Sequence, residues 1–125
     1  MIMCVWLDDI REIPEINIRH CVREEPEFGM NTYITYRAKS VNYAKSLIES
    51  AVKQNRYDGY LLDLDHDLGD YSKDGGDAYK LILWMIENGY VSNKFKFRLH
   101  TMNPVGRENM KELIIHYFGK ENYYG

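Results

Sequence analysis

The chain has 125 residues and a net charge of −3, and 45 % of its residues are hydrophobic. This length and composition suit one domain, residues 1–125, with a single core. The modest charge and the lack of a long apolar stretch argue against a protein that coats nucleic acid, binds a membrane surface or spans a bilayer. The two cysteines, Cys4 and Cys21, lack metal or redox spacing, and no export signal is visible. We therefore expect free thiols in a reducing cytoplasm.

The first part of the chain predicts two strands separated by an irregular segment. Residues 1–7 form a continuous apolar run that ends at an acidic pair, which is typical of a strand buried on both faces. Residues 10–31 contain proline and glycine and alternate only weakly, so we expect irregular structure or a small hairpin there. Residues 32–36 are rich in β-branched and aromatic side chains and predict a second strand.

The middle of the chain alternates between helical and strand patterns. Ser40 is a capping residue, and the apolar residues that follow it recur at helical spacing over residues 41–54. A nearly continuous apolar run then predicts a third strand at residues 59–64. After a polar, glycine-containing loop, Asp77 is expected to cap a second helix that stops at Asn88 and the glycine after it.

The last part of the chain predicts a strand, a helix and a tail. Alternating apolar residues indicate a fourth strand at residues 95–99. Asn103 followed by Pro104 is typical of a helix start, because asparagine caps and proline fits the first helical position. Gly119 is expected to end this third helix. Residues 120–125 are expected to be loose.

Strands that alternate with helices predict a parallel sheet with helices on its faces. We expect a doubly wound, flavodoxin-like α/β fold with three α/β/α layers. Its mostly parallel, four-stranded sheet is expected to have the order 2-1-3-4. The pattern does not predict the fifth strand of such a fold, because nothing strand-like follows the third helix.

Acidic residues follow two of the predicted strands. Asp8 and Asp9 end the first strand, and Asp65 and Asp67 follow the third. In the order 2-1-3-4 these strands are neighbours, about 5 Å apart, and ligands bind beyond the carboxyl ends of strands where their order reverses. Carboxylates this close raise each other's pKa unless a cation lies between them, and oxygen ligands favour Mg²⁺, Mn²⁺ or Ca²⁺ over zinc. We expect these four aspartates to bind a divalent metal, Mg²⁺ or Mn²⁺ before others.

A candidate anion site lies at the predicted start of the third helix. The free N–H groups and the dipole of a helix N-terminus favour an anion. Arg107, one turn into the helix, adds a guanidinium suited to phosphate, and Asn103 and Gly106 lie beside it in the sequence. His100, at the end of the fourth strand, is expected between this anion site and the metal site.

Three segments carry a resemblance to a known family. They read L-D-D-I-R at residues 7–11, L-D-H-D-L-G at residues 64–69 and H-T-M-N-P-V-G-R-E-N-M at residues 100–110. Together they resemble the cyclic-phosphate processing receiver domains, a divergent branch of the receiver fold of two-component signalling. The resemblance implies a receiver-like fold and an enzyme or binder for RNA ends or nucleotides that carry cyclic phosphates.

The resemblance also implies roles for the matching residues. Asp8 and Asp9 match the acidic, metal-binding pair of a receiver, and Asp65 matches its phosphate-accepting aspartate. The other residues that match the family's motifs are His66, Asp67, Gly69, His100, Asn103, Gly106 and Arg107. A signalling receiver has a lysine at the end of its fifth strand, for which we find no candidate. His100 also stands where a receiver's fourth strand ends in Ser or Thr, although Thr101 follows it. Both departures argue against a phosphoaspartate switch.

The leading hypothesis is metal-dependent hydrolysis or recognition of 2′,3′-cyclic phosphates on RNA ends or nucleotides, as in RNA repair. Its catalytic residues are expected to be His100, His66 and Asp65, with a histidine as general acid or base. The residues expected to bind phosphate are Arg107, Asn103, Gly106 and Arg11.

Two alternatives remain. One is a non-catalytic regulatory or nucleotide-binding receiver, with a phosphoaspartate at Asp65. The other is a phosphatase of the haloacid-dehalogenase kind, suggested by Asp63 and Asp65 after an apolar strand. We expect no membrane partner, and both a monomer and a homodimer stay open.

Overall fold

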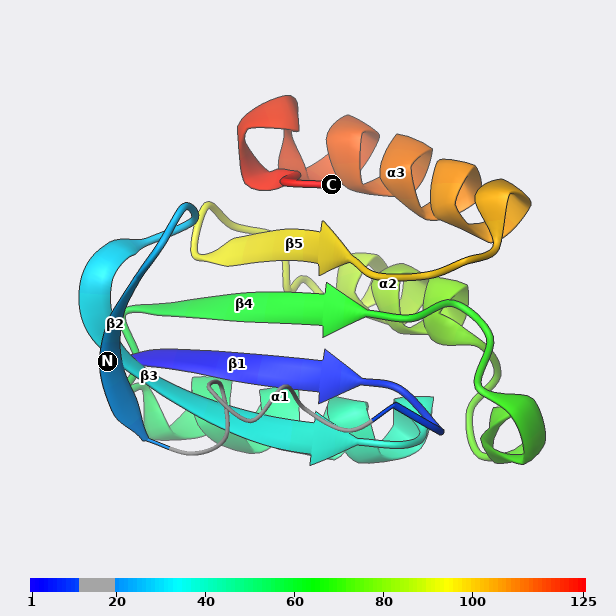
Figure 1. Cartoon of the computed structure of the whole chain (residues 1–125), viewed down its shortest axis with the longest axis horizontal. Coiled ribbons are helices and arrows are strands. Elements are labelled where there is room, and N and C mark those ends of the chain that lie inside the picture. The colour runs from blue at the N-terminus through cyan, green and yellow to red at the C-terminus, as the bar shows by residue number, and fades with distance from the viewer. Residues whose placement is uncertain (12–19) are drawn as a thin grey trace.

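The computed structural model describes residues 1–11 and 20–125, and its five described strands form one sheet in the order β2-β3-β1-β4-β5 (Figure 1). The strands are β1 (Ile2–Leu7), β2 (Cys21–Glu25), β3 (Gly29–Ala38), β4 (Gly59–Leu64) and β5 (Phe95–Leu99). From β3 to β5 all neighbours are parallel, whereas β2 is antiparallel to β3. The flavodoxin-like class is therefore confirmed, and the predicted order 2-1-3-4 corresponds to β3-β1-β4-β5.

The sheet has one strand more than the four predicted. β2 pairs with the first half of β3, and the turn between them ends at Gly29, whose φ of 67° lies in the left-handed region that favours glycine. The hairpin expected as one option for residues 10–31 is thus present in its C-terminal part. Residues 12–19, the rest of that prediction, lie outside the described residues.

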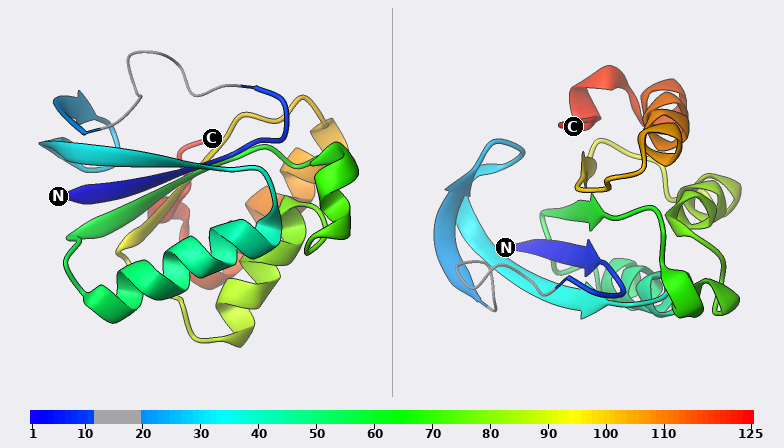
Figure 2. Two further views of the ribbon diagram at one scale, coloured as in Figure 1. Left: turned by 90° about the horizontal axis from the view of Figure 1, so that it is seen from below. Right: turned by 45° about the vertical axis from the view of Figure 1, so that its right-hand side comes forward.

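The three α-helices pack on the same face of the sheet. They are α1 (Val41–Gln54), α2 (Ala78–Glu87) and α3 (Pro104–Phe118). Their buried apolar residues form one cluster with Met3, Val5 and Leu7 of β1, and the left view of Figure 2 shows the helices on one side of the sheet. The expected three α/β/α layers therefore reduce to two layers among the described residues.

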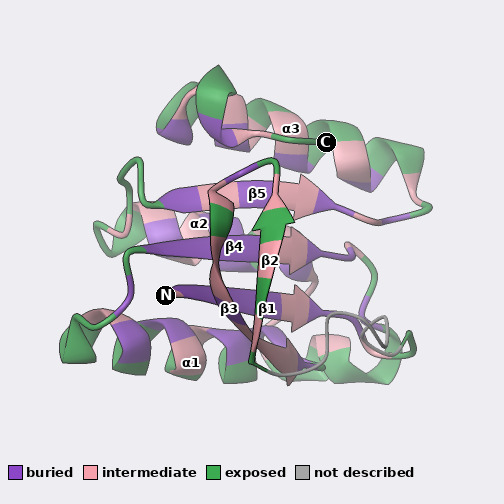
Figure 3. Ribbon diagram, turned by 60° about the vertical axis from the view of Figure 1, so that its left-hand side comes forward, coloured by how far each residue is buried: buried purple, intermediate pink, exposed green. Residues whose placement is uncertain are grey.

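The opposite face of the sheet buries a smaller apolar group. Ile2 and Cys4 of β1 contact Leu61 and Tyr33 there, with Phe28 packed against them. Burial on both faces explains the continuous apolar run of β1, which Figure 3 shows buried along most of its length. Cys4 and Cys21 are both free thiols in the structure.

The C-terminal residues are packed, so the prediction of a loose tail is wrong. The short 3₁₀ helix η3 (Lys120–Asn122) ends at Asn122, which is fully buried. The side-chain amide of Asn122 donates to the Phe118 carbonyl at 2.6 Å, and its Oδ1 accepts from Lys96 Nζ at 2.8 Å. Tyr123 then forms an isolated parallel bridge with Phe97 of β5. This single bridge lies at the edge of β5, where a further parallel strand of a receiver fold would pair.

The sheet brings the carboxyl ends of β1, β4 and β5 to one edge (Figure 1). β1 lies beside β4 with Leu7 opposite Leu64, and β4 lies beside β5 with Leu64 opposite Leu99. The residues that follow these three strands are therefore neighbours in space. Among the described residues, no helix has both the length and the apolar character needed to cross a membrane.

Candidate functional site

Three carboxylates converge where β1 and β4 end. Asp8 and Asp9 follow β1, and Asp65 follows β4. One oxygen of each carboxylate lies within 4.8 Å of the others. The parallel register of the two strands produces this approach, because the residues directly after Leu7 and Leu64 emerge side by side. The structure thus brings together three of the four predicted metal ligands, and we call Asp8, Asp9 and Asp65 the carboxylate cluster.

Asp8 is held in place by its neighbours and stays ionised. Its side chain is 1 % exposed, and its Oδ1 accepts the backbone N–H groups of Ile10 at 2.9 Å and Arg11 at 2.8 Å. Its Oδ2 lies 2.9 Å from His100 Nε2 and 3.3 Å from Arg11 Nε. Burial acts to raise the pKa of Asp8, but the hydrogen bonds from Arg11, Ile10 and His100 outweigh burial and lower it.

Asp9 has the opposite electrostatic environment. Burial raises the pKa of Asp9, and the charges of Asp8, Asp65 and Asp67 raise it further. Its carboxylate approaches Gly69 so closely that a Cβ at this glycine would lie 2.6 Å from Asp9 Oδ2. Gly69 begins the short 3₁₀ helix η2 (Gly69–Lys73) with a φ of 54°, so both its conformation and this close approach favour glycine.

The carboxylate cluster fits a hard divalent cation. Its three side chains offer only oxygen atoms, which Mg²⁺ and Mn²⁺ prefer. Asp65 Oδ1 accepts the backbone N–H of His66 at 2.8 Å, which fixes the direction of its carboxylate. A cation between the three side chains would offset the repulsion that raises the pKa of Asp9.

The cluster forms the floor of an open pocket of about 450 Å³. The residues that line it are Asp8, Asp9, Ile10, Arg11, Asp65, Asp67, Gly69, Thr101, Met102 and Asn103. Arg11, with a side chain that is 47 % exposed, is the one cation among these described lining residues. Of the predicted site residues, His66, His100, Gly106 and Arg107 are not part of this lining.

His100 does not line the pocket, and its imidazole lies between the carboxylates of Asp8 and Asp63. Its Nδ1 is 2.7 Å from Asp63 Oδ1, while its Nε2 faces Asp8. The indole of Trp6 stacks on the imidazole with centroids 4.0 Å apart, and the Trp6 N–H donates to the Arg11 carbonyl at 3.0 Å. His100 and Trp6 therefore orient the turn that carries Asp8 and Arg11.

Trp6 and Asp63 take part in this arrangement, although the sequence pattern did not predict them as site residues. Trp6 lies opposite Asp63 across β1 and β4, and Asp63 lies opposite Arg98 across β4 and β5. The signal that could have found Asp63 is a charged residue inside the otherwise apolar strand β4, next to its last residue. Arg98 Nη1 is 3.7 Å from Asp63 Oδ2, which extends the polar contacts from the site across the sheet.

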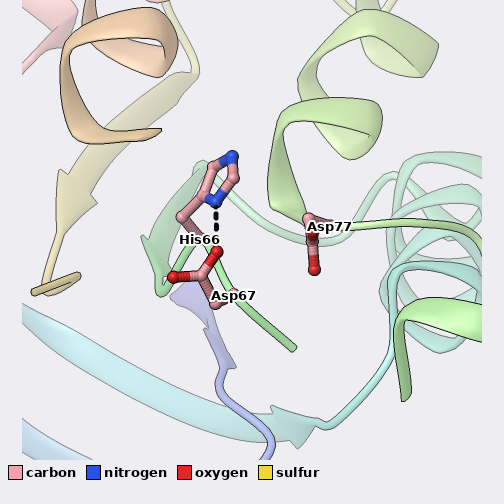
Figure 4. Close-up of side chains that lie close together, drawn as sticks. All are labelled: His66, Asp67 and Asp77. Carbon is pink, nitrogen blue, oxygen red and sulfur yellow. Dashed lines mark hydrogen bonds and ion pairs between the residues drawn. The ribbon is translucent and has the colours of Figure 1, made fainter. Parts of the chain in front are cut away.

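Asp67 belongs to a different group of side chains from the carboxylate cluster. His66 Nδ1 lies 2.8 Å from Asp67 Oδ1, and Figure 4 shows the imidazole and this carboxylate turned toward each other. The hydrogen bond to His66 is the main cause that lowers the pKa of Asp67, and Asn103 Nδ2 adds contacts at 3.2 and 3.3 Å. His66, Asp67 and Asp77 form a second group with metal-binding potential. The four aspartates expected to bind one metal ion therefore fall into two groups. Asp67 lines the same pocket as the carboxylate cluster but does not belong to it.

Asp77 has a role that differs from the expected one. It precedes α2 as predicted, but its side chain makes no capping hydrogen bond to that helix. Instead, Asp77 Oδ1 accepts the backbone N–H of Leu68 at 3.0 Å. It thus holds the loop that follows β4 against the start of α2.

The start of α3 confirms the predicted cap. Asn103 Oδ1 accepts the N–H of Gly106 at 3.0 Å. A Cβ at Gly106 would lie only 2.5 Å from His66 Cγ, so the close packing of the helix start against the His66 ring requires a glycine at this position. Arg107 Nη2 donates to the carbonyls of Leu99 and Thr101, both at 3.2 Å. Arg107 therefore braces the connection from β5 to α3, and the guanidinium at the pocket is that of Arg11.

Comparisons with known proteins give one match. The family model of the cyclic-phosphate processing receiver domain matches residues 3–116, a range that includes all three motifs and every residue of the carboxylate cluster. No curated protein and no solved structure matches the chain. Because the match spans most of the sequence, the chain belongs to the cyclic-phosphate processing receiver domain family.

Proposed function

We propose that this protein hydrolyses 2′,3′-cyclic phosphates on nucleotides or RNA ends with the help of a divalent cation. The observation that carries the proposal is the carboxylate cluster in an open pocket that the Arg11 guanidinium also lines. Such a pocket repels an anionic ligand unless a cation offsets the carboxylates. The family's name supplies the class of ligand, and the hard-oxygen donor set supports Mg²⁺ or Mn²⁺.

The reaction opens a five-membered cyclic phosphodiester. The oxygen of a water molecule bonds to phosphorus, one ring P–O bond breaks, and the proton of the water passes to the ribose oxygen that leaves. A divalent cation bound here supplies Lewis acidity, which polarises a phosphoryl oxygen and makes water more acidic. Arg11 is the residue that we assign to a phosphate oxygen, because its guanidinium lines the pocket.

The histidines are proposed to act through carboxylates rather than on the substrate. Neither His66 nor His100 lines the pocket. We assign His100 to positioning Asp8 and His66 to positioning Asp67, from the contacts at 2.9 and 2.8 Å. Replacing a partner that orients a metal ligand in this way typically costs about 10–100-fold in metal affinity or activity.

Metal-dependent turnover is the direct test of the proposed function. With Mg²⁺ or Mn²⁺, we expect the ³¹P NMR signal of adenosine 2′,3′-cyclic phosphate to be replaced by that of a monoester. With excess EDTA, the cyclic signal should persist. The matched control is the Asp70→Asn variant, because Asp70 is exposed and does not line the pocket. A cyclic phosphate that stays intact with every divalent cation, or that is opened equally well in EDTA, would contradict the proposal.

The two alternatives have less support. Arg11 is the one cation among the described lining residues, which therefore include no lysine of the kind that a phosphoaspartate receiver uses. Asp63 contacts His100 and Arg98 and does not line the pocket with Asp65, which disfavours a haloacid-dehalogenase arrangement. Stable labelling of wild type by acetyl phosphate, lost in Asp65→Asn, would favour the regulatory receiver instead.

A further inference from the structure

Two large apolar side chains stand exposed at the mouth of the acidic pocket. Met102 is 84 % exposed and Ile10 is 79 % exposed, the two highest values among the described large hydrophobic residues. Both line the pocket that contains the carboxylate cluster. Exposed apolar side chains beside a polar site are typical of ligand-binding surfaces.

The backbone holds both side chains in fixed relation to the cluster. The N–H of Ile10 donates to Asp8 Oδ1 at 2.9 Å. In the connection from β5 to α3, Met102 lies between Thr101, which is 4 % exposed, and Asn103, whose N–H donates to Thr101 Oγ1 at 3.1 Å. The two apolar groups are therefore presented by anchored loops rather than by free chain ends.

We propose that Ile10 and Met102 form a platform that contacts the face of the ligand's nucleobase. The proposal rests on the proposed function, because it places the phosphate of the same ligand at the carboxylate cluster. A base is planar and uncharged, so it can lie on an apolar rim without the repulsion that the aspartates exert on an anion. The thioether of Met102 adds a polarisable contact that suits an aromatic ring.

The same pocket offers little that distinguishes one base from another. Both polar atoms of the Asn103 side chain already have hydrogen-bond partners. Its Oδ1 accepts the Gly106 N–H, and its Nδ2 donates to Asp67. The Thr101 hydroxyl already accepts the Asn103 N–H. Recognition through the face of the base, rather than through its edge, tolerates any base. The proposed ligand is therefore any nucleoside 2′,3′-cyclic phosphate, alone or at the end of an RNA.

Paired ligands with and without a base test the platform. Binding to the Mn²⁺-loaded protein is compared for adenosine 2′,3′-cyclic phosphate, its uridine counterpart and 1-O-methylribose 2,3-cyclic phosphate, which lacks a base. In the double variant Ile10→Ala, Met102→Ala, we expect the Kd for both nucleotides to rise about tenfold and the Kd for the base-free ligand to stay unchanged. The control is Val22→Ala, Met30→Ala, because these side chains are 71 % and 66 % exposed and do not line the pocket.

The binding and turnover measurements together separate the platform from the hydrolysis. Wild type that binds all three ligands equally, or a double variant that weakens them equally, overturns the platform even where turnover is seen. A base-dependent loss of affinity without any turnover supports the platform and contradicts the hydrolysis. Failure to bind any ligand overturns both. Comparing the Kd of a short RNA that ends in a 2′,3′-cyclic phosphate with the Kd of the mononucleotide shows which of the two binds more tightly.

Discussion

Replacing Asp65 with asparagine is expected to lower the rate of cyclic-phosphate hydrolysis by about 10²–10³-fold, the usual loss when one group that stabilises transition-state charge is removed. The fold should survive, because the amide keeps an oxygen that can accept the His66 N–H now bound by Asp65 Oδ1. The negative charge is lost, and with it one of the three carboxylates of the carboxylate cluster. The variant therefore isolates the charge of Asp65 from its structural role.

Stability measurements give the same variant a second readout. A ligand present at about 100 times its Kd stabilises the folded state by about 2.7 kcal/mol, so Mn²⁺ should raise the free energy of unfolding of wild type by about that much. The gain should be far smaller in Asp65→Asn. Without metal, the variant should be at least as stable as wild type, because one of three mutually repelling charges is gone. Asp70→Asn should behave as wild type in both assays, and equal stabilisation of Asp65→Asn by Mn²⁺ would count against the cluster as a cation site.

Replacing Arg98 with methionine is expected to reduce the free energy of unfolding by about 3–5 kcal/mol, the range for a buried charge left without its partner. Arg98 donates from Nη2 to Glu25 at 2.9 Å and also contacts Glu27, whose side chain is 1 % exposed. Burial acts to lower the pKa of Arg98, but the hydrogen bonds to Glu27 and Glu25 outweigh it and raise the pKa. Methionine would fill much of the space of the arginine side chain but would leave the Glu27 charge without its partner.

Urea unfolding monitored by circular dichroism measures this loss. The double variant Arg98→Met, Glu27→Gln should recover part of it, because the buried acid is then neutral. Lys94→Met, at an exposed position just before β5, serves as the matched control and should change stability little. A loss below about 1 kcal/mol for Arg98→Met would show that solvent already screens these charges.

Most elements could be predicted because their local signals agree with their tertiary contacts. The bounds of α1, β4 and β5 match the predicted ranges, and the Ser40 hydroxyl accepts the Tyr43 N–H as a cap should. β2 was not predicted as a separate strand. Arg23 and Glu25 of β2 are charged. Arg23 pairs with Glu25 in the same strand and Glu25 pairs with Arg98 of β5, and only these ion pairs make this face of β2 suitable for partial burial.

The site could be predicted only in part for a similar reason. Residues that directly follow adjacent parallel strands must converge, which placed Asp8, Asp9 and Asp65 correctly. The position of Asp67 depends instead on a contact between the loop after β4 and Asn103 at the start of α3. Such a contact between segments far apart in sequence leaves no local pattern. Arg107 was expected at the phosphate from its place one turn into the helix, but its guanidinium donates to the backbone carbonyls of Leu99 and Thr101. Backbone carbonyls are present at every residue, so the sequence pattern does not reveal these partners.

The location of a bound cation tests the central claim most directly. Anomalous diffraction from crystals soaked in MnCl₂ should show a manganese peak coordinated by carboxylate oxygens of Asp8, Asp9 and Asp65. A peak only at His66, Asp67 and Asp77, or no peak at either group at saturating Mn²⁺, would contradict the account.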